Sequence, residues 1–179
     1  MTREEILINS IWTSGKMQVY SEFFQKEVHL DLFTSNYNLK NTDKIVSEKF
    51  VLAVNDFLQL PSESSDLLKK LLYKHCLACC EHTSYGFDIL DGETETQANL
   101  REFGVSNEEA AFEKSYLNHI VIDESEQNDN RYVRMVFYPV WEEEHGCELI
   151  IKNGVLLNYF GESGTYIGQF DYEVPSDDV

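Results

Sequence analysis

Polar and apolar residues alternate in two early segments of the chain. In KEVHLDLF (26–33), Val28 and Leu30 alternate with polar neighbours such as His29, which is the period of a half-buried strand. The segment before it, GKMQVYSEFF (15–24), is also rich in strand-forming residues. The two segments together predict an N-terminal strand pair, with His29 on its polar face.

The apolar period then changes to that of a helix. Residues 42–60 place their apolar side chains at helical spacing, and residues 62–82 do the same with leucines and cysteines. Pro61 ends the first helix, because proline lacks the N–H that would continue it. Since the break between the two segments is so short, we expect them to form an antiparallel helical pair.

Strands and turns dominate the pattern after residue 82. Residues 83–105 contain several glycines and acids and are interpreted as irregular, whereas SNEE begins a capping box that predicts a short helix over 107–114. The segments 115–123 and 131–141 are apolar enough to be strands.

Asn153 and Gly154 separate two further apolar runs, CELII (147–151) and VLLNYF (155–160). Both residues tolerate positive φ, so the pair predicts a tight β-hairpin. The tail adds a predicted strand, TYIGQFDYE. The expected fold is therefore a single α+β domain over 1–179: a strand pair, a helical pair, and an antiparallel β-meander that contains the Asn-Gly hairpin.

Negative charge is concentrated in the second half of the chain. The formal net charge is −18, and residues 81–130 carry thirteen acidic but two basic residues. Such a chain repels nucleic acid and anionic membranes and attracts basic proteins. The sequence contains no apolar run long enough for a membrane helix and no N-terminal signal pattern, so we expect a cytoplasmic protein.

Four cysteines raise the question of a metal site. Cys79 lies between His75 and His82 at helical spacing, and Cys76 and Cys80 lie on an adjoining face. Thiolates and imidazoles suit zinc, but zinc sites draw ligands from two elements, and a second C-x-x-C is missing. We therefore interpret the cysteines as core residues, while a metal at these side chains stays open.

The stretch WEEEHG is a second candidate for chemistry. Its spacing differs from H-E-x-x-H, and in an extended segment Glu142 and Glu144 point away from Glu143 and His145. We interpret it as a rigid turn before the hairpin, with Trp141 in the core and the acids facing water or a partner. The sequence also lacks a phosphate loop, a dinucleotide fingerprint and a G-x-S-x-G elbow, so no cofactor is expected.

The segment RYVRMVFYPVWEEEHGCELIIKNGVLLNYFGES resembles a signature of uncharacterised bacterial domains: an apolar strand, Trp, an acidic pair, Glu-His-Gly, and a hairpin. Trp141, Glu144, His145 and Gly146 carry the resemblance. Similar domains occur near polymorphic-toxin and contact-dependent inhibition loci, where several are taken for immunity proteins. The resemblance implies a protein that binds and neutralises a cognate toxin, and it implies no catalytic residues.

An acidic protein would complement a basic toxin such as a nuclease, whose phosphate site is lined with Lys and Arg. The sequence thus leads to the hypothesis of a stoichiometric inhibitor rather than an enzyme. Two alternatives stay open: a metal-dependent enzyme that uses Glu144, His145 and His119, and an interaction adaptor without a toxin. The residues predicted to bind the partner are Asp88, Asp91, Glu93, Glu95, Glu142, Glu143, Glu144 and His145.

Overall fold

A computed structural model describes residues 1–11, 15–32, 46–123 and 129–171 of the chain. Its centre is one seven-stranded sheet with the strands in sequence order. The strands are β1 (Ser10–Ile11), β2 (Lys16–Ser21), β3 (Lys26–Asp31), β4 (Ser115–Asp123), β5 (Tyr132–Pro139), β6 (Cys147–Lys152) and β7 (Val155–Leu156). The described helices are α1 (Arg3–Asn9), α3 (Glu48–Leu58), α4 (Ser64–His82), α5 (Glu95–Phe103) and α6 (Glu108–Glu113), with a 3-10 turn, η1, at Ile167–Phe170.

The sheet is antiparallel except between β3 and β4, which are parallel. A parallel pair needs a crossover connection, and here it contains α3 to α6. The strand pair β2–β3 and the mixed α and β composition agree with the prediction from the pattern. The β6 and β7 strands pair on either side of Asn153 and Gly154, which both have positive φ, 49° and 84°.

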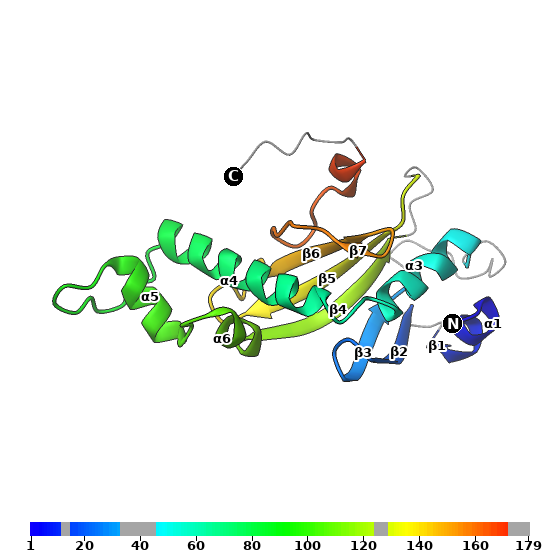
Figure 1. Ribbon diagram of the computed structural model, residues 1–179, viewed down its shortest axis with the longest axis horizontal. Coiled ribbons are helices and arrows are strands. Elements are labelled where there is room, and N and C mark those ends of the chain that lie inside the picture. Colours follow the sequence, from blue (N-terminus) through cyan, green and yellow to red (C-terminus); the bar gives the residue numbers. More distant parts are fainter. Residues whose placement is uncertain (12–14, 33–45, 124–128, 172–179) are drawn as a thin grey trace.

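The helices α3 and α4 lie across one face of the sheet and cover the main core (Figure 1). Apolar side chains alternate to this face from the central strands, for example Met135 and Phe137 from β5 and Leu149 from β6. The second face is covered in part by the C-terminal segment, because Tyr132 and Ile150 pack there against Ile167.

The predicted antiparallel helical pair is wrong. Figure 1 shows α3 and α4 following one another along the same face of the sheet instead of folding back on each other. Helix α4 finds its helical neighbours in α5 and α6. Each of α3 and α4 buries its apolar stripe on the sheet, so neither needs the other to cover it.

Two other element predictions need correction. The segment predicted as irregular contains α5, which begins with a capping box between Thr94 and Gln97 and ends at Gly104 with φ 68°. In the tail, the segment predicted as a strand forms η1 in its described part. Near the N-terminus, the largely apolar residues 6–11 divide between the end of α1 and β1.

Candidate protein-binding site

The stretch WEEEHG forms a turn between β5 and β6. Trp141 is buried, and its indole nitrogen donates to Nδ1 of His75 at 3.0 Å. Glu142 caps the turn, because its Oε1 accepts from the His145 backbone N–H at 3.1 Å and lies 3.1 Å from His145 Nδ1. The expected alternation of the four polar residues does not hold here, since a turn brings positions three apart together.

This turn separates the acids into two groups. Glu142 is half-buried and engaged with His145, whereas Glu143 and Glu144 are exposed. The enzyme alternative depended on Glu144 acting together with His145. In the structure, His145 contacts Glu142 instead. The glutamates at 143 and 144 face solvent next to a rigid structural element.

The connection from α4 to α5 forms a projecting arm, defined here as residues 83–95, at one end of the molecule (Figure 1, left). Arg101 of α5 holds this acidic arm in shape. Its guanidinium pairs with Glu93 at 3.0 Å and donates to the backbone oxygen of Asp88 at 2.8 Å. Glu93 also accepts from the Leu90 backbone N–H at 3.0 Å, and its pKa is lowered mainly by the hydrogen bond from Arg101.

Aromatic contacts fix the base of the arm. The rings of Tyr85 and Phe87 both pack edge-on against Phe103, with centroids 4.9 and 5.4 Å away. The Tyr85 hydroxyl donates to the backbone oxygen of Trp141 at 2.8 Å. This hydrogen bond ties the arm to the WEEEHG turn, so the two acidic segments lie at the same end of the molecule.

The tip of the arm exposes apolar side chains. Ile89 and Leu90 are 53% and 57% exposed, and we call them the apolar tip. Acidic side chains exposed to solvent flank the tip on both sides in the sequence, at Asp88 and Asp91. An apolar centre with a charged rim is the composition of a protein-binding surface.

The predicted partner-binding residues thus have different environments. Six of them are exposed: Asp88, Asp91, Glu95, Glu143, Glu144 and His145. Glu93 is engaged with Arg101, and Glu142 and His145 are engaged with each other. The apolar tip was missed from sequence, although the run FDIL was visible, because it lies in a segment that was interpreted only by its charge.

The histidines and cysteines of α4 are not all in the core: His75, Cys76 and Cys80 are buried, Cys79 is half-buried, and His82 is exposed. His75 accepts from Trp141 at Nδ1, so its ring proton lies on Nε2, which faces Cys79 Sγ at 3.7 Å. Burial lowers the pKa of His75 to about 4 and raises that of Cys79 to about 12, so both side chains are neutral at pH 7. Within the described ranges, no three His, Cys, Asp or Glu side chains are grouped to hold a metal ion.

Simple alternation along β4 would put His119 on the same face as Leu117, two residues earlier, but the structure puts it on the other face. A bulge in β4 shifts the register between Leu117 and His119. The extra residue turns His119 to the face opposite the buried Leu117 and Ile120. Its imidazole is 26% exposed and lies far along the sheet from the WEEEHG turn, at the β3 side of β4.

A tyrosine-to-phenylalanine change at position 85 tests the connection between arm and turn. We expect Tyr85→Phe to lower the free energy of unfolding by about 1 kcal/mol, because the Trp141 carbonyl loses its donor. Amide hydrogen exchange should accelerate in residues 85–93 more than in β5. Unchanged exchange in the arm would show that the hydrogen bond does not hold it.

Comparison with known proteins assigns the chain to a family. No curated protein and no solved structure shows significant similarity to the chain. No helix in the described part of the chain is long and apolar enough to cross a membrane. A family model described as "Domain of unknown function (DUF6985)" matches residues 3–171, which include the arm, the WEEEHG turn and all described strands. The chain therefore belongs to the DUF6985 family of domains of unknown function.

Proposed function

We propose that this protein is a cytoplasmic, non-catalytic inhibitor that binds the basic surface of a partner protein, in the manner of an immunity protein that neutralises a bacterial toxin. The observation that carries the proposal is the apolar tip, exposed on an arm whose shape is supported by the Glu93–Arg101 ion pair and the Tyr85–Trp141 hydrogen bond. Large exposed apolar residues that cluster on a projecting loop mark interaction sites.

The chemistry of the arm indicates the class of partner. Carboxylates around the apolar tip favour a partner with Lys and Arg around an apolar depression, and the net charge of −18 would speed the encounter. The active site of a nuclease has such a surface, since it binds phosphates with Lys and Arg. Occlusion of that site would inhibit the enzyme with no chemistry by the inhibitor.

Rigidity supports binding by the arm. Ordering a loose loop on association costs free energy, which a preorganised loop avoids. The bonds of Glu93 to Arg101 and of Tyr85 to Trp141 favour the observed conformation of the arm before a partner arrives. Glu93 thus acts in this proposal as a positioning residue for the tip, while Asp88, Asp91, Glu95, Glu143 and Glu144 face the partner.

Replacement of both residues of the apolar tip, Ile89 and Leu90, tests the proposal. We expect the tagged wild-type protein to capture one basic protein from native lysate at 1:1 stoichiometry, and the Ile89→Ser/Leu90→Ser variant to lose it. The stability of the variant should change by less than about 0.5 kcal/mol, because both side chains are mostly exposed.

The matched control is the variant Ile8→Ser/Val155→Ser, which removes two exposed apolar side chains elsewhere on the surface. It should capture the same partner as the wild type. Equal capture by all three proteins would overturn the role of the arm. If the captured partner keeps its activity when it is saturated with this protein, the protein is an adaptor and not an inhibitor.

A further inference from the structure

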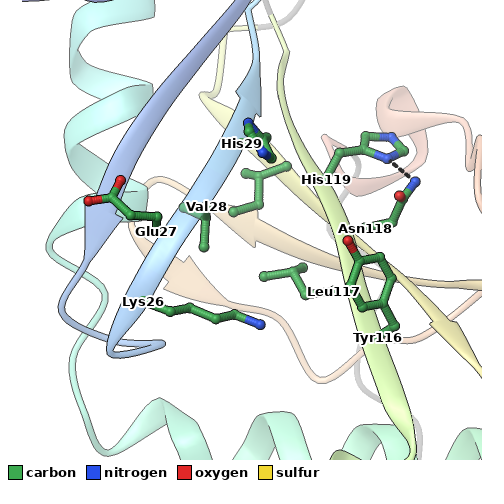
Figure 2. A pocket seen from close by; sticks show the side chains of 9 residues that line it. Lys26, Glu27, Val28, His29, Tyr116, Leu117, Asn118 and His119 are labelled. Carbon is green, nitrogen blue, oxygen red and sulfur yellow. Dashed lines mark hydrogen bonds between the residues drawn. The ribbon is translucent and has the colours of Figure 1, made fainter.

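A gap interrupts the sheet between its two parallel strands. Register pairs between β3 and β4 exist at Leu30–Ile120 and Asp31–Val121, and the strands then diverge toward Lys26 and Tyr116. Figure 2 shows the open space between them. This cleft has a volume of about 250 Å³, and it lies well away from the acidic arm.

The cleft combines apolar and hydrogen-bonding side chains. Val28 and Leu117 extend into the space between the strands, and both are largely buried, at 4% and 8% exposure (Figure 2). Side chains that can donate hydrogen bonds surround this floor, and Figure 2 shows Lys26 extending toward the gap. The polar rim consists of Lys26, His29, Tyr116, Asn118 and His119.

The charges around the cleft favour an anion. Glu27, although a lining residue, lies on the side of β3 away from β4 in Figure 2. The Asp31 carboxylate lies 3.5 Å from the Lys16 ammonium and 4.0 Å from His119 Nε2. The side chains of Lys26 and His29, by contrast, make no hydrogen bond or ion pair with the described residues, and the charge available to a ligand is that of Lys26.

His119 also lines the cleft, although Figure 2 shows its ring on the side of β4 away from Lys26, and it carries a further donor. Its Nδ1 lies 2.7 Å from the amide nitrogen of Asn118, which donates to it, so the ring proton of the neutral form is on Nε2. The distance of 4.0 Å to Asp31 is too long for a hydrogen bond, which leaves this N–H able to serve a ligand.

We propose that the cleft between β3 and β4 binds a small organic acid, with its carboxylate at Lys26 and its apolar body over Val28 and Leu117. The volume is equivalent to about eight waters at ~30 Å³ each, which suits one ring or a short chain with a carboxylate. The site is independent of the proposed inhibitor function, because its residues are not part of the arm.

Three probes that share a phenyl ring but differ in charge test this proposal: benzoate, benzamide and benzylammonium. Each is titrated into the ¹⁵N-labelled full chain and followed by amide chemical shifts. We expect benzoate to shift the amides of Val28 and Asn118 saturably, with a dissociation constant on the order of 1 mM, and the other two probes to bind at least tenfold more weakly. Equal shifts with benzylammonium, or no saturable shift with benzoate, would overturn the proposal.

A matched pair of lysine variants locates the carboxylate. Lys26→Gln should weaken benzoate binding about tenfold, as expected for loss of a charged hydrogen-bond donor. Lys70→Gln removes the same charge from an exposed position on α4 and should leave the affinity unchanged. Equal weakening in both variants would show that benzoate responds to net charge alone, which contradicts a site at Lys26.

A carboxylate on an apolar body also occurs at the end of a peptide chain. A tripeptide that ends in phenylalanine is therefore titrated beside benzoate. Tighter binding of the tripeptide would assign the ligand to the C-terminus of a protein, and tighter binding of benzoate would assign it to a free acid. In either case, Lys26→Gln should weaken binding of the tighter ligand about tenfold, as for benzoate.

Discussion

Replacement of Gly146 by alanine is expected to lower the free energy of unfolding by about 4 kcal/mol. Gly146 has φ 70°, a left-handed conformation that costs an L-residue about 1–2 kcal/mol. A Cβ atom would also lie 2.6 Å from the carbonyl oxygen of Phe137. That oxygen belongs to β5 in the middle of the sheet and cannot move without disturbing the pairing with β6, which accounts for the remaining ~2 kcal/mol.

Chemical denaturation measures this loss, and Gly92→Ala is the matched control. Gly92 has a similar φ, 82°, but a Cβ atom there would have no neighbour within 4 Å. We expect its loss to be about 1 kcal/mol, which is the backbone contribution alone. If both variants lose the same stability, the close approach of Gly146 to Phe137 does not constrain the turn.

The second large effect is a loss of stability in acid that depends on His75. Burial lowers the pKa of His75 in the folded protein to about 4, whereas the unfolded chain has the ordinary value of 6.5. Between these values the unfolded state binds more protons than the folded state, so stability falls as the pH decreases from 6.5 to 4. The difference corresponds to about 3 kcal/mol, and below pH 4 this contribution changes no further.

The variant His75→Gln isolates this contribution, because glutamine keeps an acceptor for the Trp141 N–H but does not titrate in this range. Carboxylates titrate in both proteins, and their contribution cancels in the difference between the two stability curves. We expect the wild type to lose about 3 kcal/mol more than the variant from pH 6.5 to 4. Parallel curves would contradict a buried, neutral His75.

Local patterns predicted most of the elements but not their arrangement. The periods of 2 and 3.6 located β2, β3, α3 and α4 because each buries one face. The direction of α4 relative to α3 depends on which surface each covers, and the chain between them does not encode that. Helix α5 was missed although Thr94, Gln97 and Gly104 provide its capping signals, because the acids and glycines of that segment resembled a loop.

For the candidate site too, the sequence predicted local features but not the contacts between distant residues. Charge identified the acidic segments, and the WEEEHG stretch was interpreted as a turn with Trp141 in the core, which agrees with its burial. The contacts that give each acid its role join distant residues, such as Tyr85 to Trp141 and Glu93 to Arg101. Contacts of this kind depend on the tertiary fold, so the sequence alone did not separate engaged acids from exposed ones.

Binding through the arm is tested most directly by calorimetric titration of the captured partner into three proteins at low and high salt. They are the wild type, the Ile89→Ser/Leu90→Ser variant, and a variant with amides in place of the five exposed acids, Asp88, Asp91, Glu95, Glu143 and Glu144. We expect the tip variant to bind at least 30-fold more weakly at both salt concentrations, which is about 2 kcal/mol. The amide variant should lose mainly the dependence on salt. If both variants bind with the affinity and the salt dependence of the wild type, the partner does not bind through the arm.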